Sequence, residues 1–204
     1  MSARSTMTPI EQVRRHLLEA AAVQRQLAEL ASPVIADAAE QVAQRVARGG
    51  KIMLCGNGGS ASDSQHLAAE FTNRLRASTD RPPIPAIALS TDTSYLTARA
   101  NDYGFDDVFE RLVEALGRPG DVLVAISTSG NSKNVIRAVQ RCEGRDILTI
   151  GLLGSSGGAL ARLVDIAIVV PSESTQHIQE SHIAIGHIFS EIVEEKLYGP
   201  EGLL

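Results

Sequence analysis

The chain has no tryptophan, and aromatic residues make up only 3% of its 204 residues. Proteins that bind single-stranded nucleic acid usually combine stacking aromatics with a basic surface. Here the formal net charge is −5. The densest basic stretch, residues 74–81, mixes its arginines with neutral and acidic side chains. We therefore expect no nucleic-acid partner.

Long apolar runs are also missing. No stretch approaches the roughly 18 apolar residues that a membrane-spanning helix requires. Residues 1–16 lack the continuous apolar segment of a secretory signal. Cysteine is scarce: Cys55 and Cys142 stand alone, without CxxC or Cys/His spacing, as is typical of reduced thiols in a reducing compartment. These absences predict a cytoplasmic protein with no membrane partner.

The N-terminal part is predicted to be helical. Thr8-Pro9-Ile10-Glu11 has the pattern of a capping box with proline at the first helical position. Apolar residues then recur close to every 3.6 residues up to about residue 30. Ser32-Pro33 predicts a break, followed by a second helix that ends near Arg48.

Beyond residue 48 the pattern changes to short apolar runs separated by helical stretches. The runs are continuous rather than alternating, as in strands buried on both faces of a parallel sheet: 52–55, 86–89, 122–126, 147–152 and 166–170. Helices are expected near 60–76, 106–116, 132–143, 157–163 and about 174–197. This alternation predicts an α/β fold, a doubly wound three-layer αβα sandwich around a five-stranded parallel sheet.

We therefore expect a single domain over residues 1–204. It consists of a helical N-terminal extension, about 8–48, and an α/β core, about 49–198. Residues 1–6 and 199–204 are expected to be loose ends.

In doubly wound sheets, ligands bind beyond the carboxyl ends of the strands, here after Cys55, Leu89 and Ile126. The first of these loops is Gly56-Asn57-Gly58-Gly59-Ser60, and it leads into a helix whose first amides favour an anion. A tight strand-to-helix turn would explain the same glycines.

The loop after Ile126 is Ser127-Thr128-Ser129-Gly130-Asn131-Ser132. Its four hydroxyls and the following helix N-terminus form a neutral cradle suited to phosphate. A serine-rich helix cap is the alternative interpretation.

Two pairs of residues have the chemistry of metal ligands. His66 and Glu70 are four apart on a predicted helix and share one face, and an imidazole with a carboxylate suits zinc. A solvent-exposed pair is the alternative. Gln179 and His187 are eight apart on the last predicted helix, about 12 Å of helix rise. They reach one ion only if both lean inward or if they belong to neighbouring subunits.

These segments, with Ala100-Asn101-Asp102-Tyr103-Gly104-Phe105 and Ile178-Gln179-Glu180-Ser181-His182, resemble the sedoheptulose 7-phosphate isomerases of the sugar-isomerase (SIS) superfamily over nearly the whole chain. The resemblance implies conversion of sedoheptulose 7-phosphate to D-glycero-D-manno-heptose 7-phosphate through an enediol(ate). That reaction is the first step of ADP-heptose synthesis, which supplies lipopolysaccharide or another glycan. The resemblance also implies a homotetramer with active sites at subunit interfaces.

The same resemblance implies roles for individual residues. One zinc per subunit would be held by His66, Glu70, Gln179 and His187. The sugar phosphate would be contacted by Asn57, Gly58, Gly59, Glu70, Asn101, Asp102, Ser127, Thr128, Ser129, Ser132 and Gln179. Isomerisation needs a base at carbon and an acid at oxygen, and we assign these roles to Glu70 and His187. A catalytic, a structural and an inhibitory role for zinc all remain open.

One residue departs from the pattern of the phosphoheptose isomerase family. Position 177 is histidine where the family leads us to expect arginine; we expect it to face solvent rather than to carry protons.

A non-catalytic SIS protein that binds the replication initiator DnaA would lack the paired Glu70 and His187. A sugar-phosphate-sensing SIS module would usually accompany a DNA-binding domain, and this sequence contains no helix-turn-helix pattern.

Overall fold

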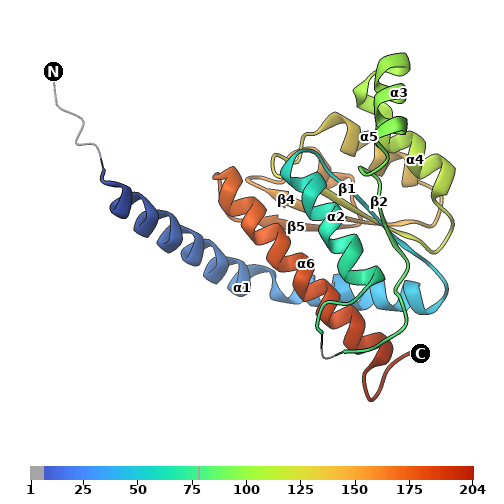
Figure 1. The fold of residues 1–204 in the computed structure, drawn as a ribbon, viewed down its shortest axis with the longest axis horizontal. Coiled ribbons are helices and arrows are strands. Elements are labelled where there is room, and N and C mark those ends of the chain that lie inside the picture. Colours follow the sequence, from blue (N-terminus) through green and yellow to red (C-terminus); the bar gives the residue numbers. More distant parts are fainter. Residues whose placement is uncertain (1–6, 78) are drawn as a thin grey trace.

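The computed structural model describes residues 7–77 and 79–204. A five-stranded parallel sheet with strand order β2-β1-β3-β4-β5 forms its middle layer (Figure 1). The strands are β1 (Ile52–Cys55), β2 (Ala86–Ala88), β3 (Val122–Ser127), β4 (Leu148–Gly154) and β5 (Ile166–Val170). Every residue of β1, β3 and β4 is buried, which explains their uninterrupted apolar sequences. The predicted fold class is confirmed.

Helices cover both faces of this sheet, and each face has its own apolar core. On one face lie α1 (Pro9–Ala47), α2 (Gly59–Thr72) and α6 (Thr175–Tyr198); on the other lie α4 (Val108–Leu116) and α5 (Lys133–Cys142). Neighbouring β1 residues divide between the two cores: Ile52 and Leu54 face α1, α2 and α6, whereas Met53 and Cys55 face α4 and α5. Cys55 and Cys142 are both free and buried, as two reduced thiols should be.

The predicted break at Pro33 is wrong, because α1 continues through it. Proline has no N–H to bond the carbonyl one turn earlier, here that of Glu29. The neighbouring Ser32 hydroxyl donates to a different carbonyl, that of Ala28, at 2.6 Å. The helix beyond Pro33 is buried against the sheet through Ile35, Ala38, Ala39, Val42, Ala43 and Val46. Tertiary packing of this face stabilises the helix across the proline. The capping box is confirmed: Thr8 N donates to Glu11 Oε2 at 2.8 Å, and Glu11 N donates to Thr8 Oγ1.

The first half of α1 projects from the body of the molecule (Figure 1). It carries large apolar side chains that are 61–76% exposed, namely Ile10, Val13, Leu17 and Leu18. In the described parts of the chain, every helix is too short or too polar to cross a bilayer.

Two further expectations differ from the structure, and a third concerns residues outside the described range. Residues 157–163 form only a 3-10 turn, η2 (Leu160–Arg162), because Gly157 and Gly158 adopt positive φ angles of 79° and 57° just before it. Expected loose ends at 1–6 lie outside the described residues. At the other end, Leu203 N and Leu204 N donate to the carbonyls of Lys196 and Leu197, so residues 199–204 fold back on α6.

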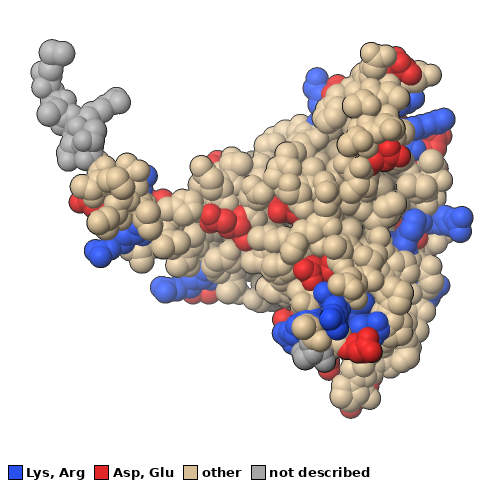
Figure 2. Space-filling model, viewed as in Figure 1, with Lys and Arg blue, Asp and Glu red and all other residues tan. Residues whose placement is uncertain are grey.

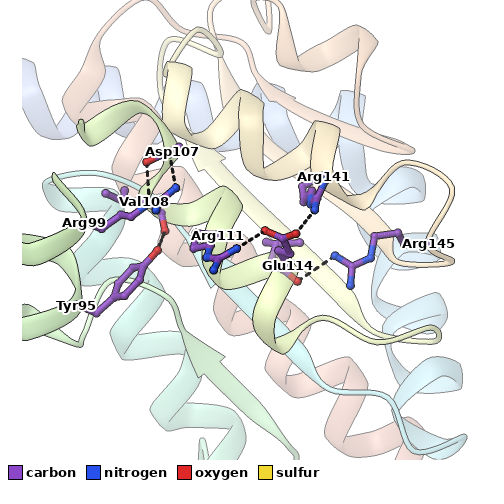
Figure 3. A network of polar contacts seen from close by, with 9 residues as sticks. Tyr95, Arg99, Asp107, Val108, Arg111, Glu114, Arg141 and Arg145 are labelled. Carbon is purple, nitrogen blue, oxygen red and sulfur yellow. Dashed lines mark hydrogen bonds and ion pairs between the residues drawn. The ribbon is translucent and has the colours of Figure 1, made fainter. Parts of the chain in front are cut away.

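Helix α3 (Thr93–Tyr103) was not predicted, because its side chains are at most half-buried and leave no apolar stripe in the sequence. Polar contacts hold it instead (Figure 3). Arg99 Nη2 donates to Asp107 Oδ2 at 2.7 Å, and the Tyr95 hydroxyl donates to the Val108 carbonyl at 2.8 Å. These bonds fix α3 against the 3-10 turn η1 (Phe105–Asp107) and the start of α4.

The polar contacts continue along α4 to α5 (Figure 3). Glu114 of α4 accepts hydrogen bonds from Arg111, at 2.9 Å, and from Arg141 of α5. The bond from Arg111, supported by Arg141, lowers the pKa of the Glu114 carboxyl. The two helices that cover this face of the sheet are thereby linked.

The basic stretch 74–81 makes ion pairs inside the chain. Arg81 is almost fully buried and donates to Glu194 of α6 at 2.6 Å, and Arg76 pairs with Glu191 of the same helix. Figure 2 shows basic and acidic side chains interspersed over the described residues of one face. The arginines of this stretch therefore help to anchor the connection between α2 and β2 on α6.

A buried histidine of α6 makes stability depend on pH. His182 Nε2 lies 3.0 Å from the Leu153 carbonyl, and Nδ1 has no hydrogen-bond partner among the described residues. Burial lowers the pKa of His182 to about 4, whereas a histidine in an unfolded chain titrates near 6.5. The unfolded chain therefore binds the proton first, and stability is lost as pH falls from about 6.5 to about 4.

We predict that this one group lowers the free energy of unfolding by about 2 kcal/mol between pH 7 and pH 5. His182→Gln removes the titration and keeps a donor for Leu153. The difference in free energy of unfolding between wild type and His182→Gln should therefore shrink by that amount as the pH falls from 7 to 5. Denaturant unfolding of both proteins at the two pH values measures the deficit, and a constant difference would contradict the assignment.

Candidate active site

The candidate site lies where the strand order reverses. In the order β2-β1-β3-β4-β5 the chain leaves β1 toward one side and β3 toward the other, so the loops after these strands border a crevice. Asn57 of the first loop and Asn134 at the start of α5 join them with two reciprocal amide hydrogen bonds of 2.9 Å. Two of the three loops singled out in the sequence are therefore adjacent.

The glycine loop makes a tight turn and also lets the Gln179 side chain approach its backbone. Gly58, at the N-cap of α2, has a φ of +56°. A Cβ on Gly59 would lie 2.2–2.5 Å from the amide atoms of Gln179 on α6. Gln179 therefore packs directly on the backbone of Gly59, which only glycine permits.

The serine loop is a set of hydroxyls rather than a helix cap. Ser132 occupies the N-cap position of α5, but its Oγ lies 3.0 Å from Ser127 Oγ, and in the described chain it caps no backbone amide. Ser129 is exposed and accepts a hydrogen bond from Asn131 N at 3.2 Å, while Thr128 is half-buried. The cap interpretation therefore fails, because Ser132 gives the first amides of α5 no side-chain cap.

Close packing of α2 on α6 brings together three of the four predicted metal ligands, among them the predicted acid and base. A Cβ on Gly186 would lie 2.4 Å from Leu67, so the helices touch at this level. Beside that contact, His66 Nε2 and His187 Nε2 are 3.0 Å apart. Glu70 Oε1 lies 3.2 Å from His66 Nε2.

These three side chains fit a zinc ion. Their ligand atoms all lie within 4.8 Å of one another. Tetrahedral zinc with bonds of 2.0–2.2 Å separates its ligand atoms by about 3.4 Å, and the two separations here are within a few tenths of an ångström of that value. Two imidazoles and a carboxylate with one open position are a typical catalytic zinc set.

The fourth predicted ligand, Gln179, lies apart from this cluster within the chain. It packs on Gly59 and lies near Asp63, which precedes His66 by about one turn of α2 and Glu70 by about two. Burial raises the pKa of the Asp63 carboxyl, and the nearby Gln179 side chain partly offsets that rise. Asp63 was not singled out in the sequence, where nothing distinguishes it from other acidic helix residues.

Asn101 and Asp102 also lie apart. Both are exposed on α3, where Asn101 Nδ2 donates to Asp102 Oδ1 at 2.9 Å. Figure 1 shows α3 standing well away from α2 and α6. Within one chain, therefore, Gln179 lies beside the glycine loop, and His66, Glu70 and His187 form a separate cluster. Asn101 and Asp102 belong to neither group.

Comparison with known proteins decides the family. A sequence model of the SIS domain matches residues 15–154. A phosphoheptose isomerase of Chlorobaculum parvum is 53% identical over 188 residues, which are 92% of this chain and 90% of that protein. The chain belongs to the phosphoheptose isomerase family. The predicted family and enzyme class, an isomerase, are confirmed.

Solved structures of the phosphoheptose isomerase family agree. The phosphoheptose isomerase GmhA of Neisseria gonorrhoeae superposes with a TM-score of 0.87 at 44% identity, covering 92% of this chain and all of that one. A phosphoheptose isomerase of Francisella tularensis gives 0.89 at 36% identity, covering 93% of this chain and all of its own. These matches offer no support for the DnaA-binding alternative.

The expectation that His177 faces solvent is wrong. The residue is only 5% exposed, and its Nδ1 lies 3.0 Å from Glu180 Oε2. The bond to Glu180, together with Glu19 at 3.5 Å from Nε2, raises the pKa of His177. A histidine held this way favours the positive charge that the expected arginine would have carried.

Proposed function

We propose that the protein interconverts sedoheptulose 7-phosphate and D-glycero-D-manno-heptose 7-phosphate, the first step of ADP-heptose synthesis. The observation that carries the proposal is the convergence of His66, Glu70 and His187 from two helices in a phosphoheptose isomerase fold. The reaction moves a proton between adjacent carbons, and it needs a carboxylate and an imidazole within reach of one substrate.

In the proposed mechanism, Glu70 removes the proton from carbon and returns it to the neighbouring carbon. One of its oxygens faces His66 at 3.2 Å, which leaves the other for proton transfer. His187 donates a proton to the carbonyl oxygen of the ketose, takes one back from the neighbouring hydroxyl as the aldehyde forms, and aids ring opening. Zinc, when bound, would supply Lewis-acid stabilisation of the charge that develops on that oxygen.

The serine loop is proposed to bind the phosphate. Ser127, Thr128, Ser129 and Ser132 present hydroxyls beside the first amides of α5, and such neutral donors satisfy phosphate oxygens. Asn57, Gly58 and Gly59 would contact the sugar from the adjacent loop. Under this proposal, the phosphate would lie at the end of β3 and the sugar at the end of β1.

We further propose a cytoplasmic homotetramer of one-domain chains, each with one zinc held by His66, Glu70, Gln179 and His187. Gln179, Asn101 and Asp102 lie apart from the His66 cluster within one chain, which favours sites completed by a second subunit. The exposed apolar side chains of α1, up to 76% accessible, favour burial in an assembly.

A direct assay tests this function. The purified protein, supplied with zinc, should convert sedoheptulose 7-phosphate, with the product identified by chromatography against authentic heptose 7-phosphate. Unphosphorylated sedoheptulose is the matched control and should react far more slowly, because the serine loop would have nothing to hold. Absence of turnover with the phosphate would overturn the proposal, and retained binding of DnaA by such a protein would favour the alternative.

A further inference from the structure

A second group of ligand-type side chains lies where α1 passes α6. His16 of α1 and His177 and Glu180 of α6 offer ligand atoms within 4.8 Å of one another. Glu180 contacts both imidazoles: Oε1 is 2.8 Å from His16 Nε2, and Oε2 is 3.0 Å from His177 Nδ1. The two rings are tilted by 50° with centroids 4.5 Å apart. All three side chains therefore point at one small space.

The surroundings suit a cation. Glu19 Oε2 lies 3.5 Å from His177 Nε2, while its other oxygen is 3.8 Å from Arg15. We therefore treat Glu19 as a nearby charge rather than as a ligand. The contacts with Glu180 and Glu19 raise the pKa of His177 and so favour a proton on it, and a bound ion would have to displace that proton. With both imidazoles neutral, the two carboxylates place two negative charges beside the group, offset in part by Arg15.

The ligand types select the metal. Two imidazoles and one carboxylate suit zinc and its neighbours in the first transition row, whereas calcium and magnesium prefer oxygen ligands. A tetrahedral ion would need ligand separations of about 3.4 Å, so the 2.8 and 3.0 Å contacts must open by a few tenths of an ångström. The side chains of His16 and Glu180 are 44% and 42% exposed, which allows this movement and leaves access for the ion and a water.

This group shares no residue with the His66 cluster, and Glu180 precedes His187 by about 10 Å of helix rise. The buried ligand of this second group, His177, occupies the position where the family pattern predicts arginine. A hydrogen bond from Gln24 Nε2 to Ser181 Oγ, at 3.2 Å, holds α1 and α6 together on the same side.

We propose that His16, His177 and Glu180 form a second zinc site that fastens α1 to α6. The site binds the ion between the first half of α1, which projects from the body, and the helix that carries the candidate active site (Figure 1). An occupied site therefore restricts the direction in which α1 projects.

Zinc stoichiometry of the full-length protein tests the proposal. The apoprotein, prepared with a chelator, should bind two zinc ions per chain in a calorimetric titration, and His66→Ala/His187→Ala should bind one. Adding His16→Ala to that background should remove the remaining ion, whereas Arg14→Ala, an exposed change on the same helix, should leave it. Circular dichroism confirms that each variant is folded.

A second measurement uses cobalt as a spectroscopic substitute for zinc. In the His66→Ala/His187→Ala background, cobalt should give the visible absorption of a tetrahedral ion, and His177→Arg should abolish it. A background variant that binds no zinc, or whose zinc is unaffected by His16→Ala, would overturn the proposal. Neither readout depends on isomerase activity.

Discussion

Replacing Glu70 by glutamine should lower kcat/KM by about 10²–10⁴-fold while the fold survives, since a positioned general base contributes about that much and the amide cannot accept the proton. Its side chain is only 18% exposed and faces His66 at 3.2 Å. His187→Ala should have an effect of similar size, because it removes the proposed acid from the same cluster.

Glu191→Gln is a suitable control for both changes. Glu191 lies one turn beyond His187 on α6, but it is exposed and pairs with Arg76, so turnover should stay within about twofold of wild type. Zinc content must be measured alongside the rates. If saturating zinc restores Glu70→Gln to wild-type turnover, Glu70 acts only as a ligand and its assignment as the base is wrong.

Gly130→Ala should destabilise the protein by about 3 kcal/mol or more and weaken phosphate binding. Gly130 has a φ of +65°, and a Cβ there would lie 2.0 Å from the Gly157 carbonyl oxygen. The clash is with backbone, so the serine loop and the loop after β4 must separate. Their present contact includes the hydrogen bond from Leu160 N to the Gly130 carbonyl at 3.0 Å.

The chain supplies a matched control for this change. Gly144 has a similar φ of +70°, but a Cβ there meets nothing within 4 Å. Gly144→Ala should therefore show only the strain of the left-handed conformation, about 1–2 kcal/mol. Urea unfolding and the KM for the sugar phosphate measure both effects. Equal destabilisation by the two substitutions would show that the contact with Gly157 is unimportant.

Local chemistry was enough to predict the sheet and its loops. The apolar runs are continuous because β1, β3 and β4 are buried on both faces, and a parallel sheet places the loops after them at one edge. His66 and Glu70 were predictable as a pair because one helical turn brings them onto one face. Helix α3 escaped prediction because polar contacts such as Arg99 to Asp107, rather than an apolar face, hold it.

By itself, then, the sequence determined the fold class, the two polar loops and the ligand types, since each depends on residues close together in the chain. Only the tertiary structure decided that α1 passes through Pro33, since that depends on packing against the sheet. It also placed His187 beside His66 and His16 beside His177. Those pairs are separated by more than a hundred residues, and the packing of α6 on α2 and α1 brings them together.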